Sequence, residues 1–90
     1  NHRAAGSMRI EANVGRDHAA DAFSRLPGVK DVSVEPDGDY SIFTLRLEAN
    51  ADPGEDVMRL AMQNQWPVRE LLRKRATLED VFVELTHSDS

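Results

Sequence analysis

The chain has 90 residues, a formal net charge of −5 and no cysteine. Its length fits one small domain of modest stability, because a chain of this size buries only about 60–65% of its extended surface. The acidic balance argues against a nucleic-acid footprint, which needs clustered positive charge, and the lack of cysteine excludes disulfides and thiolate metal sites.

The first seven residues differ from the rest of the chain, because they are rich in small residues and show no apolar periodicity. Gly6-Ser7-Met8 is typical of an expression scar joined to native sequence, so we expect residues 1–7 to form a leader outside the fold. A single domain is expected over residues 8–87, with a frayed tail at residues 88–90.

The next two segments predict a strand and a helix. Alternating apolar and polar residues over 8–14 are typical of a half-buried strand. Over 17–26 the apolar residues recur at helical spacing, with Asp17 as the expected N-cap and Pro27-Gly28 as the stop. The apolar stripe of this helix is Ala19, Ala22, Phe23 and Leu26.

A hairpin and a second helix are predicted in the middle of the chain. Val32 and Val34 begin a strand, residues 36–39 form a turn by composition, and residues 40–47 alternate again. Asp52-Pro53-Gly54-Glu55 is typical of a helix start, with Asp52 as N-cap and Pro53 at the first helical position. The buried stripe of this helix is expected to be Val57, Leu60 and Ala61, flanked by Met58 and Met62 and stopped before Pro67.

Residues 68–75 are compatible with an edge strand or with a longer helix. We favour the strand, because a β-α-β-β-α order needs a fourth strand to finish its sheet. The predicted fold is α+β: a ferredoxin-like β-α-β-β-α-β antiparallel sheet with two helices on one face and an added C-terminal helix. The helix-covered face would carry Ile10, Val14, Val32, Val34, Phe43, Leu45 and Leu47. The opposite face would be mostly polar, with Arg9, Glu11, Asn13, Ser33, Glu35, Ile42, Thr44 and Arg46.

The added helix is predicted over residues 77–86, with Thr77 as N-cap and Asp80 as its capping-box partner. Its apolar residues fall at i, i+3, i+4 and i+7 on one face. We call them the C-terminal stripe: Leu78, Val81, Phe82 and Leu85. Burying such side chains yields about 1.5–3 kcal/mol each, so the stripe should fold back on Ile42, Trp66 and Leu71 or dock outside the domain.

Candidate chemical groups have simpler explanations. His2, His18 and His87 do not form a credible metal set, because a site needs three or four convergent ligands, and an exposed histidine at a helix start is favoured for position 18. Helix capping and a solvated face explain Glu79, Asp80 and Glu84 better than an acid–base cluster does, although this acidic edge could meet a basic patch on a partner. Trp66 is expected to pack on the core.

The closing segment Thr77-Leu78-Glu79-Asp80-Val81-Phe82, with an acidic residue, Leu and Thr after it, resembles the end of ATP-binding subunits of ABC-type exporters. Gliding-motility, sodium-export and drug-resistance types share this ending. Leu26-Pro27-Gly28-Val29 and Val68-Arg69-Glu70-Leu71 look like the same appended domain, and the resemblance covers most of the chain. It implies a domain of about this size that comes after a nucleotide-binding domain.

The ATPase machinery of such subunits is missing from this sequence. A phosphate loop needs Gly-x-x-x-x-Gly-Lys-Ser/Thr, whose backbone N–H groups cradle the nucleotide, and none of the five glycines stands in that arrangement. We therefore expect no catalytic, cofactor-binding or metal-binding residue in this chain. ATP and magnesium belong to the parent subunit that the resemblance implies.

The resemblance implies a non-catalytic accessory or regulatory domain that packs on the nucleotide-binding domain of the same or the partner subunit. It also implies an indirect link to a membrane permease and a cytoplasmic place at the inner face of the membrane. The interaction residues are expected to be the C-terminal stripe, with Arg73 and Arg75 as rim charges. Charge decoration of an exposed edge strand is the simpler explanation of the basic residues Arg69, Arg73, Lys74 and Arg75.

A second interpretation comes from another class of function. Ferredoxin-like modules include amino-acid-binding regulatory domains that dimerise through sheet edges, so a small-molecule sensor and a homodimer stay open. An RNA-binding domain is disfavoured, because it needs stacking aromatic residues that the polar sheet face does not supply.

Overall fold

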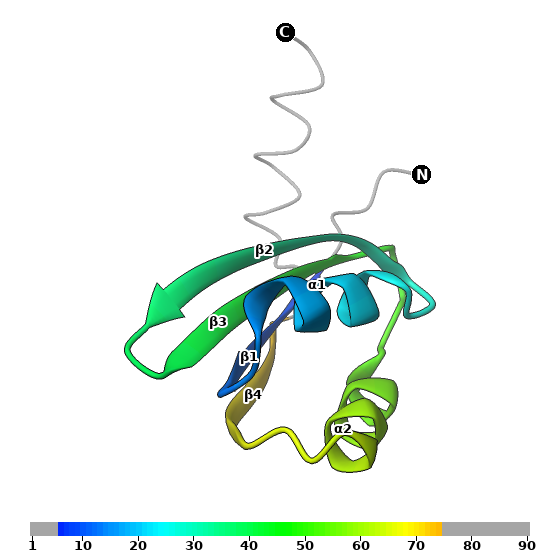
Figure 1. Ribbon diagram of the computed structural model, residues 1–90. Helices are drawn as coiled ribbons and strands as arrows, with labels where there is room; N and C mark the ends of the chain where they lie inside the picture. Colours follow the sequence, from blue (N-terminus) through cyan, green and yellow to red (C-terminus); the bar gives the residue numbers. More distant parts are fainter. Residues whose placement is uncertain (1–5, 75–90) are drawn as a thin grey trace, which may run out of the picture.

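The computed structural model describes residues 6–74 of the chain. Six elements succeed one another along it (Figure 1): β1 (Ser7–Ala12), α1 (Arg16–Ser24), β2 (Val29–Asp37), β3 (Tyr40–Leu47), α2 (Gly54–Gln63) and β4 (Val68–Lys74). The helix predicted over 77–86 lies outside the described residues.

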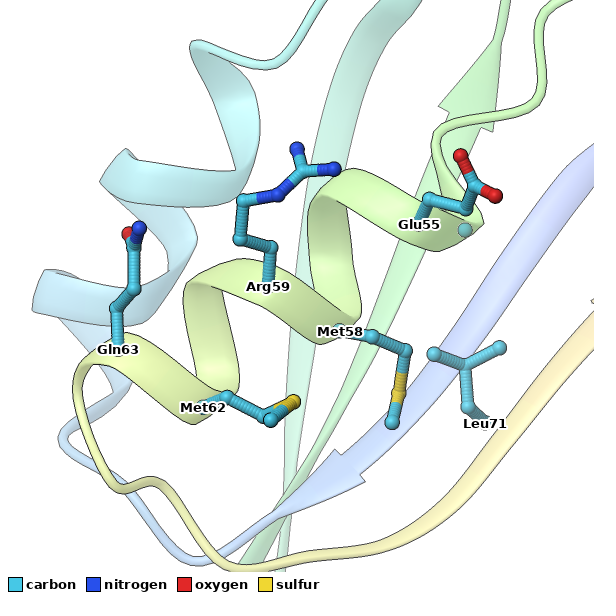
Figure 2. A pocket seen from close by; sticks show the side chains of 7 residues that line it. Glu55, Met58, Arg59, Met62, Gln63 and Leu71 are labelled. Atoms are coloured by element: carbon cyan, nitrogen blue, oxygen red, sulfur yellow. The ribbon is translucent and has the colours of Figure 1, made fainter.

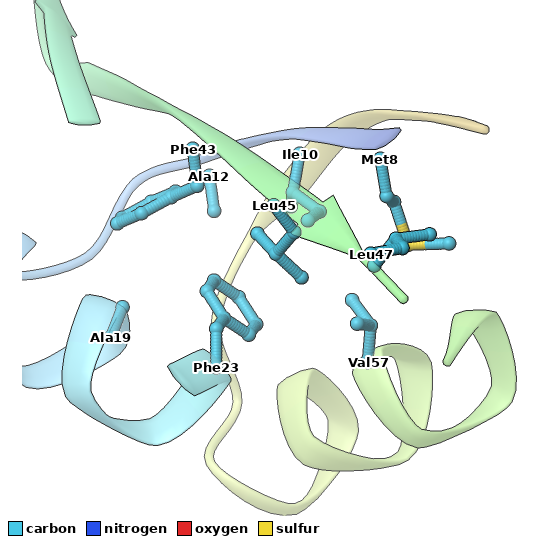
Figure 3. Packing of buried hydrophobic residues seen from close by; sticks show 9 residues of the cluster. All are labelled: Met8, Ile10, Ala12, Ala19, Phe23, Phe43, Leu45, Leu47 and Val57. Carbon is cyan, nitrogen blue, oxygen red and sulfur yellow. The ribbon is translucent and has the colours of Figure 1, made fainter. Parts of the chain in front are cut away.

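The four strands form one antiparallel sheet in the order β2-β3-β1-β4, so β1 and β3 are central. The strand expected over residues 68–75 is confirmed as β4, which pairs with β1. Both helices lie over the same face of the sheet, and their side chains point at those of β1 and β3 (Figure 3). The prediction of an α+β fold with two helices on one sheet face is confirmed.

Strand β1 is shifted toward the N-terminus relative to the predicted strand over 8–14. Ser7 already pairs with Arg46 and Lys74, and the carbonyl of Gly6 accepts a hydrogen bond from the N–H of Leu47 at 3.1 Å. At the other end the ladders on both sides stop at Ala12. The first and last residues of β1 therefore depend on where the neighbouring strands β3 and β4 pair with it. The alternation within residues 8–14 carries no information about those strands.

Helix α1 begins two residues earlier than predicted, since its N-cap is Gly15 and not Asp17. The carbonyl of Gly15 accepts the first helical hydrogen bond, from Ala19 at 3.1 Å. Asp17 lies instead in the first turn, where its negative charge is favoured by the helix dipole. The helix ends at Ser24, two residues before the predicted end at Leu26, and Gly28 adopts a φ of 85° that suits glycine.

The predicted hairpin is confirmed as β2 and β3, joined by the two residues 38–39. Strand β3 has the predicted bounds. Strand β2 extends to Asp37, two residues further than the turn composition indicated. Pro36 lies within it, which is compatible with an edge strand, because the missing N–H points away from the ladder.

Helix α2 starts one residue later than predicted, since Pro53 is the N-cap and Gly54 the first helical residue. The carbonyl of Pro53 accepts from Val57 at 2.8 Å, and Asp52 Oδ1 accepts from the N–H of Gly54 at 3.3 Å. Asp52 thus assists the helix start from one position further out. The helix ends at Gln63, ahead of Pro67 as expected.

The core lies between the helices and the sheet. Phe23 of α1 meets Phe43 of β3 edge to face, with ring centroids 5.2 Å apart, and meets Trp66 at 5.7 Å. Trp66 packs against the core as expected. The buried hydrophobic residues are Met8, Ile10, Ala12, Ala19, Phe23, Phe43, Leu45, Leu47, Val57 and Ala61 (Figure 3). Val14, Val32 and Val34 are half-buried against this cluster, on the predicted face.

Candidate interaction surfaces

An apolar hollow of about 690 Å³ lies between α2 and the edge strand β4. We call it the α2–β4 groove. Met58 and Met62 extend from α2 on the side of Leu71 of β4, whereas Arg59 and Gln63 extend the other way (Figure 2). The residues that line the groove are Gly54, Glu55, Met58, Arg59, Met62, Gln63 and Leu71.

The groove exists because α2 carries apolar residues on two neighbouring sides. Val57 and Ala61 face the sheet and are buried. Met58 and Met62, each one position further and four residues apart, share the adjacent side and are 45% and 74% exposed. Methionine is flexible and polarizable, which suits surfaces that adapt to a partner. The sequence pattern placed both methionines beside the buried stripe but did not indicate a surface there.

Arg73 is held within the domain. Its Nη2 donates a hydrogen bond to the carbonyl of Ala51 at 3.0 Å, and its Nε lies 3.5 Å from Asp52 Oδ1. The side chain is 27% exposed and ties the end of β4 to the loop before α2. Its predicted contact with a partner stays a prediction. Arg75 and the C-terminal stripe (Leu78, Val81, Phe82, Leu85) lie outside the described residues.

An ion-pair cluster occupies the open face of the sheet. Arg69 of β4 donates from Nε to Glu11 Oε1 at 2.7 Å and from Nη2 to Asp37 Oδ2 at 2.5 Å. Its guanidinium lies over the ring of Tyr40, 4.4 Å from the centroid. Arg9 contacts the other oxygen of Glu11 at 2.8 Å. Together these contacts join β4, β1 and the β2–β3 hairpin.

Glu11 is only 7% exposed, although the alternation placed it on the open, polar face. The hydrogen bond from Arg69 lowers the pKa of Glu11, as do the charges of Arg69 and Arg9, while burial opposes them. The same contact raises the pKa of Arg69. The pairing depends on a register shift of the β1–β4 ladder between Glu11 and Ala12, and no local sequence signal predicts it. The cluster is a structural tie between the strands.

Within residues 6–74 no group of three or more His, Cys, Asp or Glu side chains could hold a metal ion. His18 is exposed, and its ring lies roughly perpendicular to that of Trp66, with the ring centroids 5.9 Å apart. His2, His87 and the acidic residues Glu79, Asp80 and Glu84 lie outside the described part. Neither helix in that part has the length and apolar character needed to cross a membrane.

The comparison with known families identifies a C-terminal domain of transporter ATPases. A family model described as "ATP-binding protein DrrA1-3-like, C-terminal domain" matches residues 2–86. Because the match covers nearly the whole chain, the chain belongs to this family. The resemblance to the appended domain of ABC-type ATP-binding subunits is thereby confirmed. No curated protein sequence matches the chain significantly.

Proposed function

We propose that this chain is a non-catalytic accessory domain of an ABC-type ATP-binding subunit, which acts by packing on the ATPase domain of its own or the partner subunit. The observation that carries the proposal is the family match, since it makes the chain the C-terminal domain of an ATP-binding protein. The α2–β4 groove supports it, because an apolar hollow beside exposed methionines is suited to a protein contact.

The chemistry is proposed to lie in the rest of the subunit. The chain has no phosphate loop, so ATP and magnesium would be bound by the nucleotide-binding domain. The domain would reach the permease only indirectly, from the inner side of the membrane. Export, including the drug-resistance and gliding-motility types, is the transport class that the resemblance implies.

We also propose that the fold is ferredoxin-like. The β-α-β-β-α-β element order and the sheet order β2-β3-β1-β4 support this classification. In this arrangement the helices cover one face of the sheet. The edge strands β2 and β4 are the two strands at which another polypeptide segment could pair with the sheet.

The proposed mechanism is mechanical. The domain would stabilise the closed, ATP-bound ATPase dimer relative to the open one, which requires contacts that differ between the two states. The C-terminal stripe is the proposed latch, with Phe82 at its centre and Arg73 and Arg75 at its rim. The hydrogen bond from Arg73 to Ala51 supports a place at the rim of the latch indirectly, because it fixes the point where the chain leaves β4.

The test is a binding measurement between the 90-residue chain and the separately produced ATPase domain of its subunit, with and without ATP. We expect binding that is tighter with ATP, and at least about tenfold weaker binding for Phe82→Asp, since about 1.4 kcal/mol corresponds to a factor of ten. Leu72→Ser, on the open sheet face, is the matched control and should bind like wild type. Absence of binding in both nucleotide states, or ATP hydrolysis by the chain alone, would overturn the proposal.

A thermal-shift screen separates the sensor hypothesis from the accessory-domain proposal. The groove has the volume of a small-ligand site, which is why the screen is worth making. Amino acids, nucleotides and metal ions should leave the melting temperature unchanged under the accessory-domain proposal. Reproducible stabilisation by one metabolite would favour the sensor.

A further inference from the structure

We propose that residues 77–86 of this chain seat the C-terminal stripe in the α2–β4 groove of the same molecule when the domain stands alone. The groove is then the resting position of the proposed latch. This inference concerns the domain by itself, so it can fail or hold independently of docking on an ATPase domain.

The first argument is where the chain leaves the described fold. Strand β4 ends at Lys74, and Arg73 is hydrogen-bonded to Ala51, in the loop that leads into α2. Gly54, the first residue of α2, lines one end of the groove. The chain therefore leaves β4 beside the start of α2. Residues 75–77 span up to about 10 Å when extended, which is enough to turn into the groove.

The second argument is length and direction. A helix over residues 77–86 would be about 15 Å long at 1.5 Å per residue. Helix α2 has 10 residues and the groove runs along it from Gly54 to Gln63, so the two lengths match. A segment that starts at the Gly54 end runs in the same direction as α2. Val81 then comes level with Met58, and Leu85 comes level with Met62.

The third argument is charge. Glu79 and Glu84 flank the C-terminal stripe on either side at helical spacing. Arg59 lines the groove, is 61% exposed and pairs with Asp56 at 3.0 Å; because it extends away from Met58 and Met62, it offers a positive charge to Glu84 only at the outer edge of the groove. Glu55 lies at the end where the segment would begin, and a negative charge there is favoured by the dipole of the incoming helix.

The open face of the sheet is the competing seat and fits less well. Leu72 is 54% exposed there, but its neighbours across the ladders are charged or polar. Arg9 pairs with Leu72 along β4 and with Thr44 along β3, and Arg46 and Lys74 lie in the adjacent row. Four apolar side chains would find one strongly exposed apolar partner on that face, compared with two methionines and Leu71 in the groove.

Disulfide trapping tests the seat directly, because the chain contains no cysteine. The pair Met62→Cys with Leu85→Cys should close within one molecule under mild oxidation at low protein concentration, since the Cα atoms must come within about 7 Å. The matched pair Leu72→Cys with Leu85→Cys, which targets the open face, should not close. Mass spectrometry after proteolysis identifies the bridge.

Each other outcome overturns the inference. Closure of the Leu72 pair would place the segment on the open face, and failure of both pairs would place it on neither. A bridge found only between two molecules would mean that the groove holds the segment of a second copy.

A second measurement uses the three methionines as reporters. In ¹³C-methyl spectra of the full chain, Phe82→Leu should shift the Met58 and Met62 signals, because a ring beside them is lost while apolar packing is kept. Met8, which is 1% exposed in the core, should not move. Unchanged signals for both groove methionines would contradict the seat, whatever the result of the ATPase binding test.

Discussion

The two helices cover the same sheet face but use their apolar residues differently. Helix α1, with 9 residues, buries Ala19 and Phe23 in the core. Helix α2, with 10 residues, buries Val57 and Ala61 and leaves two methionines outside. The sheet needs only the first pair of α2 residues to close the core. The second pair leaves an apolar side of α2 exposed, and this difference separates the residues that hold the fold from those available for contact.

The largest expected effect is at the centre of α1. Phe23→Ala removes a fully buried ring that contacts Phe43 and Trp66 and should cost about 3–5 kcal/mol. That approaches the whole free energy of unfolding of a small domain. Urea unfolding monitored by Trp66 fluorescence measures it. A loss below about 1 kcal/mol would show that α1 is not the helix that holds the core.

Gly28→Ala should come next, because this residue lies where the end of α1 approaches the loop before α2. A Cβ at Gly28 would lie 2.6 Å from the Cβ of Ala51, and the φ of 85° is unfavourable for any other residue. We expect a loss of about 2–4 kcal/mol in urea unfolding. Gly38→Ala is the matched control: its φ is 62° but nothing lies within 4 Å of its Cβ, so about 1 kcal/mol should be lost. Equal losses at both glycines would contradict the close approach.

Acid stability tests the open face, which neither helix covers. The pKa of Glu11 is lowered in the folded state, so its contribution is present above the ordinary value of about 4.3 and is lost as the pH falls below it. Glu11→Gln should therefore destabilise the domain at pH 7 and flatten the decline of the urea midpoint between about pH 5 and pH 2.

Glu35→Gln, at an exposed position on the edge strand β2, is the control for the Glu-to-Gln change itself and should leave the urea midpoint at pH 7 unchanged. A Glu11→Gln variant that keeps the same acid limb would show that the Arg69 contact does not contribute.

The smallest effect is expected at Met62 in a chain that ends at Lys74. Met62→Ser changes a side chain that is 74% exposed, so it should alter stability by less than about 0.5 kcal/mol there. In the full chain the same substitution should cost more, because the C-terminal stripe would lose a partner. An equal loss of stability in the two chains would show that the side of α2 with Met58 and Met62 has no partner in the C-terminal stripe.

Much of the fold can be predicted from local pattern. Strand β3 has the predicted bounds because its alternation runs from Tyr40 to Leu47 and a two-residue turn precedes it. Strand β4 was predicted from fold economy alone, since Val68, Leu71 and Leu72 do not alternate strictly. The register shift next to Glu11 explains why: one extra residue on β4 breaks the period of two.

The helix caps and the surface were less accessible to sequence reasoning. Aspartate is a favoured N-cap residue, yet Gly15 and Pro53 occupy the N-cap positions and not Asp17 and Asp52. The first helical hydrogen bond is set by the backbone path of the preceding loop, which side-chain preference alone does not predict. Arg69 and Glu11 are 58 residues apart in the chain and are brought together by the pairing of β1 with β4, which local sequence does not reveal. The groove needs β4 beside α2, so Met58 and Met62 could be noted in the sequence but not assigned.

Ser7 and Lys74 are paired neighbours at one end of the sheet. The chain that leads into the described fold and the chain that leads out of it thus start about 4.8 Å apart, one strand spacing. A body attached upstream of Ser7 would therefore have surface close to the segment that comes after Lys74, and the two could meet without any rearrangement of the sheet.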